Sequence, residues 1–274
     1  MLFRSRVYFF FIPIVVALAT LEGLVLSWIG DRDYDWKAYL VSLFDVSVRE
    51  VLYLLPVSLA APAYVWAWDN RFATISLEGI PAFALLFLGM EFFYYWFHRC
   101  SHRTRWFWAT HAVHHSPNQL NLSAAYRFGW TGRSTGTLIF YVPMVWIGFP
   151  VGAVIATLSL NLLYQFWLHA TWIPKLGWLE YVLNTPSHHR VHHAANPEYL
   201  DSNYGGVLIV FDRLFGTFAA EREDVPCRYG LVRPLNSYNP FFVALHEWIA
   251  MGRDLVRTAT WRERLRLMIG PPGR

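Results

Sequence analysis

The sequence predicts an all-α integral membrane protein with four to five transmembrane helices and a cytosolic, histidine-rich cap that holds a dinuclear metal site. Two observations carry this fold class. Hydrophobic residues make up 55% of the 274 residues and charged residues only 15%, and several stretches approach the roughly 20 apolar residues that a spanning helix needs. In addition, ten of the eleven histidines fall between His98 and His193, most of them at helical spacing.

The first helix is expected within residues 7–29, a long apolar stretch whose one charged residue is Glu22. Arg4, Arg6 and the run Ala17-Leu-Ala19 also resemble a cleavable signal peptide. The apolar stretch continues well past that run, which a cleaved signal does not require. The pattern therefore favours an uncleaved membrane anchor.

A second membrane helix is expected over residues 51–68, which carry no charge. Pro56 and Pro62 should kink it, because proline removes a helical hydrogen bond. These two helices form the predicted N-terminal region, residues 1–80.

The predicted catalytic region, residues 81–220, begins with a third helix. Residues 81–97 are apolar except for Glu91. Residues 134–174 then run for 41 positions without Asp, Glu, Lys or Arg, which is twice the length of one span. Gly148-Phe149-Pro150 interrupts this stretch near its middle. We expect a helical hairpin over residues 134–174 with its tip at that break.

Three histidine clusters lie between and after these helices. Residues three and four apart share one face of a helix, so each cluster presents two or three imidazoles in one direction. Imidazole suits iron, zinc, copper and nickel, and a zinc site closes with four ligands. The number of imidazoles therefore predicts two metals. The clusters are His98-Arg-Cys-Ser-His102, His111-Ala-Val-His114-His115 and His188-His189-Arg-Val-His192-His193.

Individual histidines and one cysteine have different expected roles. His169 stands at the end of the predicted hairpin, on the side of the clusters, and is expected to be a ligand. Of the adjacent pair, His189 fits the H-x-x-H-H spacing better than His188, which could support a ligand from behind. His246 is isolated and is expected to be structural. Cys100 points away from the His98/His102 face and is expected to be a bystander.

Glu91 lies inside an apolar helix, seven residues before His98 and on the same face. An acid within the membrane is a functional candidate by default. The expected role is to accept the second N–H of a metal-binding histidine and so orient its ring. The alternative is an interfacial glutamate that reaches toward water.

The tail, residues 221–274, predicts a helix that starts after the cap Asn239-Pro240 and runs to Arg257, and a short basic amphipathic stretch at residues 261–268. Seventeen of the 23 Lys and Arg residues lie at or beyond Arg99. The positive-inside tendency therefore places the metal site in the cytoplasm. The net charge of +4 suits anionic lipid headgroups, and no basic tract has the pattern of a nucleic-acid binder.

The order of the histidine motifs resembles the fatty acid hydroxylase/sterol desaturase superfamily of membrane di-iron oxygenases. The resemblance covers about residues 85–220 and is closest to the alkylglycerol monooxygenase-like branch. Its departures are Ala194 in place of a usual glycine and Phe211 in place of a frequent tryptophan. The stretches that carry it are residues 91–102, Asn184-Thr-Pro-Ser-His-His-Arg-Val-His-His193, Asp201-Ser-Asn-Tyr-Gly-Gly206 and Phe211-Asp-Arg-Leu-Phe-Gly-Thr-Phe218.

This resemblance implies two iron ions that activate O2 to hydroxylate an unactivated C–H bond of a membrane lipid, with ether-lipid cleavage as one form of the reaction. Zinc could replace iron in purified protein. Electrons would come from a partner protein, another external donor or a pterin. The aromatics Trp106, Trp108, Tyr126 and Trp130 could line the lipid entry, with Tyr126 and Trp130 as the substrate contacts, or form an interfacial belt.

Three function classes follow from the sequence. The first is a lipid hydroxylase or ether-lipid monooxygenase. The second is a lipid or sterol desaturase with the same site, and the third is a membrane zinc- or copper-binding protein. The charge-free hairpin argues against the third, because an ion path through a membrane needs polar lining. The expected location is the inner membrane of a bacterium or the endoplasmic reticulum of a eukaryote.

Overall fold

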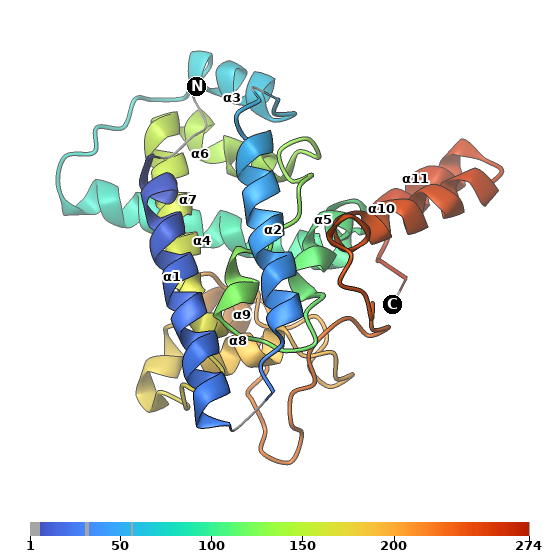
Figure 1. Cartoon of the computed structure of the whole chain (residues 1–274). Coiled ribbons are helices and arrows are strands. Elements are labelled where there is room, and N and C mark those ends of the chain that lie inside the picture. The colour runs from blue at the N-terminus through green and yellow to red at the C-terminus, as the bar shows by residue number, and fades with distance from the viewer. Residues whose placement is uncertain (1–5, 31–32, 56, 274) are drawn as a thin grey trace.

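The computed structural model describes residues 6–30, 33–55 and 57–273, and the regular elements of these residues are helices joined by loops (Figure 1). Their only β structure is two isolated bridges, Leu183 with Leu208 and Ala194 with Tyr229. The all-helical prediction is confirmed. The α-helices are α1 Arg6–Ile29, α2 Trp36–Leu52, α3 Ala61–Asp69, α4 Ile80–Arg103, α5 Arg105–His115, α6 Val142–Ile147, α7 Val151–Phe166, α8 Pro186–His192, α9 Val210–Leu214, α10 Pro240–Arg257 and α11 Trp261–Ile269. The 3-10 helices are η1 Leu122–Tyr126, η2 Thr137–Tyr141, η3 Trp167–His169 and η4 Gly177–Tyr181.

Three stretches of the described chain are long and apolar enough to cross a membrane: Phe11–Ile29, Ile80–Arg103 and Val151–His169. They correspond to α1, α4, and α7 with η3. Leu18, Leu21 and Leu24 of α1 are exposed, as lipid-facing side chains are. In Figure 1, α1 and α7 run together while α4 passes across them. The number of transmembrane helices expected from the sequence was four to five.

The second expected helix, over residues 51–68, is not a single span. α2 ends at Leu52, and α3 begins only at Ala61 and has nine residues. Pro62 lies in the first turn of α3, where its missing N–H costs nothing, and so it starts a helix instead of kinking one. Pro56 lies outside the described residues, as does Arg4 of the signal-like segment.

The hairpin break falls where the sequence places it, but the first arm is short. Gly148 has φ +133°, and a Cβ there would meet the backbone carbonyl of Ala73, so a residue without a side chain is required. Before the break, only residues 137–147 are helical. At about 2.0 Å per residue in η2 and 1.5 Å in α6 they reach roughly 19 Å, well short of the apolar thickness of a bilayer. α7 alone forms the long arm.

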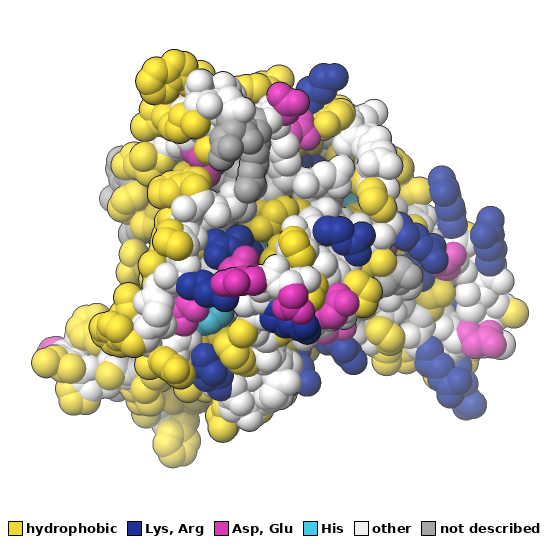
Figure 2. All heavy atoms as spheres, turned by 90° about the horizontal axis from the view of Figure 1, so that it is seen from below, with side chains coloured by type: hydrophobic (Ala, Val, Ile, Leu, Met, Phe, Trp, Pro, Cys, Tyr) yellow, Lys and Arg dark blue, Asp and Glu magenta, His cyan; other side chains and the backbone are white. Residues whose placement is uncertain are grey.

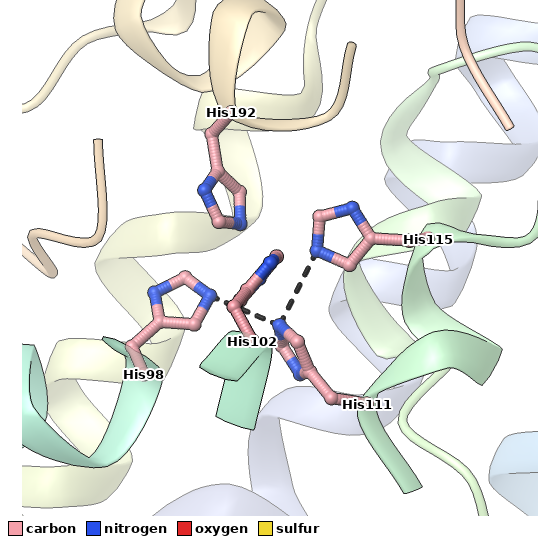
Figure 3. Close-up of side chains that lie close together, drawn as sticks. All are labelled: His98, His102, His111, His115 and His192. Carbon is pink, nitrogen blue, oxygen red and sulfur yellow. Dashed lines mark hydrogen bonds between the residues drawn. The ribbon is translucent and has the colours of Figure 1, made fainter. Parts of the chain in front are cut away.

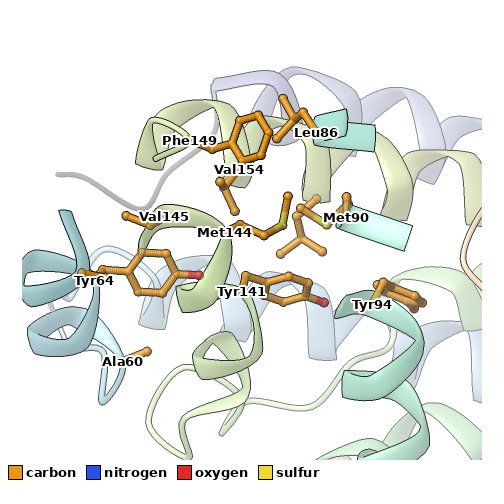
Figure 4. Close-up of a cluster of buried hydrophobic side chains, with 12 residues drawn as sticks. Ala60, Tyr64, Leu86, Met90, Tyr94, Tyr141, Met144, Val145, Phe149 and Val154 are labelled. Carbon is orange, nitrogen blue, oxygen red and sulfur yellow. The ribbon is translucent and has the colours of Figure 1, made fainter. Parts of the chain in front are cut away.

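The largest apolar core lies between α3, α4, α6 and α7 (Figure 4). Tyr64, Met90, Tyr141 and Met144 are each almost completely buried in it. The hydroxyl of Tyr64 donates to the carbonyl of Leu138 over 2.9 Å, so its polar end is satisfied inside the apolar cluster. This core packs α4, which carries His98 and His102, against α7, which leads into η3 and His169.

The end of the chain closes the site from the side of α5. Asn239 caps α10 by accepting from the N–H groups of Phe241 and Phe242, as the sequence predicts. Arg105 of α5 pairs with Asp254 of α10 at 2.5 Å. Seen from below, Lys, Arg, Asp and Glu side chains gather across the face, whereas its left margin is mostly hydrophobic (Figure 2). The molecule thus has a polar cap beside its apolar helices.

Candidate metal centre

Four elements deliver the clustered histidines. His98 and His102 lie on the last turns of α4, and His169 ends η3 directly after α7. α5 carries the second cluster and α8 carries the third. Because α4 and α5 are separated only by Thr104, the first two clusters face each other across one tight corner.

The histidine nitrogens converge into two separate groups. In each group the possible ligand atoms all lie within 4.8 Å of one another. The five-histidine group is drawn in Figure 3, where rings from α4, α5 and α8 point toward a common centre. The five-histidine group is His98, His102, His111, His115 and His192, and the four-histidine group is His114, His169, His189 and His193.

Each H-x-x-H-H motif is divided between the two groups. On α5, His111 and His115, four residues apart, turn to the five-histidine group, while His114 turns to the other. The third motif does the reverse: His189 and His193 join the four-histidine group and His192 joins the five-histidine group. Because α5 and α8 each contribute histidines to both groups, the two groups lie side by side.

The nitrogen separations match those of ligands on one metal ion. Metal–nitrogen bonds of about 2.1 Å at tetrahedral or octahedral angles put neighbouring nitrogens roughly 3.0–3.4 Å apart. The Nε2 atoms of His98 and His111 are 3.0 Å apart, and those of His115 and His111 are 3.3 Å apart. In the other group, Nε2 of His189 lies 3.1 Å from Nε2 of both His169 and His193.

Backbone carbonyls fix which ring nitrogen faces each centre. Nδ1 of His98 donates to the Tyr204 carbonyl and Nδ1 of His192 to the Ser202 carbonyl, each over 2.9 Å. A carbonyl can only accept, so in a neutral ring the Nε2 atom keeps its lone pair and points inward. The Nε2 atom of His192 is buried and has no hydrogen-bond partner among the described residues.

The four-histidine group gives the clearest test of fit. His114 donates its Nδ1 to the carbonyl of Ala124 over 3.1 Å, and His169 donates its Nδ1 to the carbonyl of Gln165 over 2.9 Å. Their Nε2 atoms lie 3.4 Å apart. With both rings neutral, two lone pairs face each other and no proton lies between them. A cation bound by both nitrogens removes that repulsion, so these residues fit a metal ion.

Burial keeps these imidazoles neutral. Removal from water lowers the pKa of His192 to about 4 and holds the pKa of His111, His115 and His193 well below the usual range, and neighbouring imidazoles lower the last three further. Neutral imidazole is the form that binds metals. The site is therefore ready to bind cations at neutral pH.

His188 is the one clustered histidine that joins neither group. Its Nε2 lies 3.9 Å from a carboxylate oxygen of Glu180, and its ring packs edge-on against Phe218. The sequence places His188 in a metal-binding cluster, either as a ligand or as support behind one, and the geometry does not bear out a ligand position. Because His188 and His189 are consecutive on α8, their side chains diverge by about 100° around the helix, and only His189 points inward.

Glu91 is buried at 1% exposure, and its hydrogen bonds within the described chain go to other groups than histidines. Its carboxylate accepts from the N–H groups of Val207 and Leu208, at 2.8 Å each, and from Nδ2 of Asn161 at 2.6 Å. The expectation that it accepts from a metal-binding histidine is wrong, because the Tyr204 carbonyl already occupies Nδ1 of His98. The alternative of an interfacial, water-seeking glutamate is excluded by its burial.

Glu91 acts on the site through a loop instead. The segment that it anchors at Val207 continues back to Tyr204, whose carbonyl holds His98. Asp212 holds the same loop from the other side, accepting from the N–H groups of Tyr204 and Gly205 at 2.7 Å each. The roles of Tyr204 and Asp212 were not predicted. Tyr204 acts through its backbone, which leaves no mark in a side-chain pattern.

Asn161 was also missed, although the sequence carries a signal for it. Asn161 and Gln165 of α7 and His169 of η3 follow at intervals of four, so they share one face. Nε2 of Gln165 donates to the Asn161 side chain over 2.7 Å, and Asn161 donates to Glu91. A polar row that ends in histidine inside an apolar helix points to a functional face.

His246 and Cys100 lie apart from both groups. Nδ1 of His246 donates to the Val243 carbonyl over 2.8 Å within α10. Cys100 is a free, half-buried thiol. Neither belongs to the sets of residues whose ligand atoms converge.

Two cavities reach the histidines from different sides. The first, of about 200 Å³, lies between several elements, includes the apolar Phe97, Leu158 and Leu162 of α4 and α7 in its lining, and reaches His111. The second, of about 350 Å³, is more polar, is lined by Arg105, Asp201, Arg233 and Glu247, and reaches histidines of both groups. Those histidines are His102, His115, His192 and His193.

The predicted entry aromatics are dispersed. Trp108 lines the polar cavity. Tyr126 is buried and lines a small cavity between α1 and α7. Trp130 packs against Phe241, with ring centroids 5.5 Å apart, and is not among the residues that line either large cavity. The two aromatics proposed as substrate contacts thus lie in different surroundings.

Comparison with known proteins places these features in a family. A family model for fatty acid hydroxylases matches residues 83–217. The chain is 40% identical over 280 residues to alkylglycerol monooxygenase of Xenopus tropicalis, which covers 98% of this chain and 58% of that protein. It is 38% identical over 264 residues to alkylglycerol monooxygenase of Homo sapiens, covering 95% of this chain and 58% of the relative.

The chain also has a shorter match to a bacterial protein. Ornithine lipid hydroxylase of Rhizobium tropici is 31% identical over 134 residues, 47% of this chain and 39% of that protein. The chain spans 58% of the length of the frog and human relatives. No solved structure matches it.

Proposed function

Because the chain belongs, through residues 83–217, to the fatty acid hydroxylase superfamily and its alkylglycerol monooxygenase branch, we propose that it is a membrane monooxygenase that hydroxylates a C–H bond of a lipid with O2. The observation that carries this proposal is the pair of histidine groups, with inward lone pairs at metal-ligand spacing, at the end of an apolar cavity. Hydroxylation next to an ether oxygen would cleave an ether lipid.

The proposed cofactor is two iron ions, one in each histidine group, with nine ligands in all. Five and four imidazoles leave open positions on six-coordinate iron, where zinc would tend to close a site with four ligands. When bound, the irons supply the activation of O2. Zinc could occupy the same groups in protein purified after overexpression, because nitrogen sites generally favour zinc over Fe(II).

The protein's own part in the reaction is to orient the histidines, to hold the substrate and to exclude water. The carbonyls of Tyr204, Ser202 and Ala124 keep inward lone pairs on their histidines. The apolar walls of the first cavity, including Phe97 and Leu158, hold the hydrocarbon chain beside His111 and keep water away from a reactive centre. The protein thus positions the reacting carbon, and the cofactor carries out the oxidation.

The second cavity is the proposed route for polar reactants. Monooxygenation consumes two electrons and two protons for each O2, and neither crosses an apolar cavity easily. The polar cavity reaches histidines of both groups and is lined by Arg105 and Glu247. We assign to it the approach of the electron donor, whether a partner protein, another external reductant or a pterin.

The chain is an integral membrane protein, and we propose that its metal site faces the cytoplasm. The basic residues concentrate beyond Arg99, and the positive-inside tendency supports this orientation. α4 and α7 with η3 both end at the metal site, so their last turns would lie on that side of the membrane. The membrane would be the inner membrane in a bacterium or the endoplasmic reticulum in a eukaryote.

Lipid profiling tests the reaction class. Cells with the wild-type protein, with the His114→Ala variant and without the protein are compared by mass spectrometry. We expect a lipid that gains one oxygen, or the cleaved products of an ether lipid, only with the wild type. Loss of two hydrogens instead would identify a desaturase. If the lipids are unchanged although the protein carries metal, the result would favour a membrane zinc- or copper-binding protein over a lipid oxygenase.

A further inference from the structure

Two buried charged side chains of α2 contact a loop that is far from them in sequence. Asp45 and Arg49 are four residues apart, so they share one face of the helix, and they are 3% and 1% exposed. α2 packs against η1, which leads into that loop (Figure 1). Both residues lie outside residues 83–217, which the fatty acid hydroxylase model matches. Charged groups buried this deeply need partners, and here the partners are backbone groups of the loop.

The two side chains fix the backbone of the loop that follows η1. The carboxylate of Asp45 accepts from the N–H groups of Phe128 and Gly129, over 3.1 Å and 3.3 Å. One Nη atom of Arg49 donates to the Tyr126 carbonyl over 2.8 Å. The loop is therefore held at both of its ends by one helix.

This loop, residues 126–129, holds a histidine of the four-histidine group. Nδ1 of His114 lies 3.2 Å from the carbonyl of Arg127 and 3.1 Å from that of Ala124, so its N–H is shared between two carbonyls. The ring of Phe128 stacks on the ring of His114, with centroids 5.2 Å apart and planes inclined by 20°. The loop thus contacts the imidazole at its edge and on its face, and together these contacts define where Nε2 points.

A continuous chain of contacts therefore runs from α2 to a nitrogen of the metal centre. The guanidinium of Arg49 lies 5.2 Å from the centre of the Phe128 ring, and Phe128 stacks on His114. Nε2 of His114 lies 3.4 Å from Nε2 of His169. A ligand set must be held to within roughly 0.5 Å of its working geometry, so a loosened loop would turn His114 away from a shared ion.

We propose that Asp45, together with Arg49, is a positioning residue for the four-histidine group: it holds the loop at residues 126–129 so that His114 presents Nε2 to the bound metal ion. A helix outside the matched region then completes the metal centre. This inference rests on the proposed metal centre, and it does not depend on the reaction that the metals carry out.

The five-histidine group has a comparable carboxylate. Asp212 is buried and accepts from the N–H groups of Tyr204 and Gly205, and the Tyr204 carbonyl holds His98. Like Asp45, Asp212 binds two consecutive N–H groups of a loop that carries a carbonyl acceptor for a histidine. Its loop serves the other histidine group, and Asp212 is therefore the matched control for Asp45.

The test is a double-mutant cycle on zinc affinity. The affinity is measured on the full chain in detergent by competition with a chelator, so no turnover is needed. Asp45→Asn should lower the overall affinity for two zinc ions about 10–100-fold, the range for residues that orient metal ligands. Because Asp45 acts through His114, Asp45→Asn should cause no further loss in protein that already carries His114→Ala.

Asp212→Asn should behave differently in the same cycle. Alone it should lower the affinity by a similar factor, but its effect should persist in full beside His114→Ala, because it acts on His98. A purely structural role of Asp45 would give this same independent behaviour, since a general loss of stability does not depend on His114.

Phe128→Leu provides a second variant with no change of charge. It removes the ring that stacks on His114 and should lower zinc affinity about 3–10-fold, the scale of an aromatic pair. It should also cause no further loss beside His114→Ala. This variant carries the test if Asp45→Asn does not fold, which circular dichroism shows.

The outcomes separate this inference from the other proposals. Wild-type zinc affinity in Asp45→Asn, or an effect that persists in full beside His114→Ala, would overturn the positioning role while the metal centre stands. Failure of the wild type to bind zinc would overturn both the metal centre and the positioning role. Coupled zinc binding without any oxidised lipid would uphold the positioning role and defeat the proposed reaction.

Discussion

At the scale of single residues, the site depends on backbone carbonyls as much as on histidines. Tyr204, Ser202, Ala124 and Gln165 each accept an Nδ1–H through their backbone and so turn a lone pair inward. The sequence predicted the imidazoles, because their spacing is periodic. It could not predict these acceptors, since every residue has a carbonyl and only the fold decides which one meets a ring.

The histidine variants test the assignment of ligands. His114→Ala and His192→Ala should each abolish activity and lower the metal content, since each removes an inward nitrogen from a different group. His246→Ala should leave both nearly unchanged, because its ring bonds within α10. Turnover and elemental analysis are the measurements. Normal turnover in the first two variants would make the histidines structural.

Substitution of Glu91 should lower activity, although Glu91 forms no hydrogen bond to a metal-binding histidine. In Glu91→Gln, an amide replaces a carboxylate that accepts from two backbone N–H groups and Asn161, so the loop that carries Tyr204 loosens. Variants behind a metal site typically lose about 10–100-fold in activity or metal affinity. We expect such a loss with helix content retained, as measured by turnover and circular dichroism. Wild-type values for both quantities would refute this role.

At the scale of elements, sequence patterns predicted where helices begin and break better than how long they are. The break at Gly148 and the cap at Asn239 were predicted correctly because each depends on local chemistry. Residues 51–68 and 134–147 read as membrane helices by composition, yet they form shorter pieces. Some of their apolar side chains pack on other helices within the core, for instance Tyr64 on α3 and Met144 on α6, and composition alone does not distinguish burial in protein from burial in lipid.

The hairpin break offers a test at this scale. Gly148→Ala places a Cβ against the carbonyl of Ala73 and strains a positive φ of 133°, so it should destabilise the fold by about 1–3 kcal/mol. Gly152→Ala is the matched control: it lies in α7 with open space around it and should be neutral or slightly stabilising. Thermal unfolding in detergent measures both. Equal unfolding temperatures would show that the break is not constrained.

At the scale of the whole molecule, the account predicts one orientation in the membrane. Ala73 and Glu223 are both exposed, the first beside the hairpin tip at Gly148 and the second on a loop of the cap. In a background without Cys100 and Cys227, a membrane-impermeant thiol reagent added outside intact cells should label Ala73→Cys and spare Glu223→Cys. The opposite pattern would invert the topology.

The arrangement of the two histidine groups also emerges only at this scale. The sequence predicted two metals from the number of imidazoles, but it did not show that each H-x-x-H-H motif is shared between the groups. The spacing favoured His189 over His188, but which of the two points inward depends on the direction in which α8 enters the site. The two cavities, one apolar and one polar, follow from packing between distant segments.

The central claim is that each chain holds two metal ions in two histidine groups. Elemental analysis of protein purified from iron-replete cells, set against protein concentration and turnover, tests it most directly. We expect close to two metals per chain, mostly iron, with activity that rises with iron content. One metal per chain at full activity would contradict the dinuclear site.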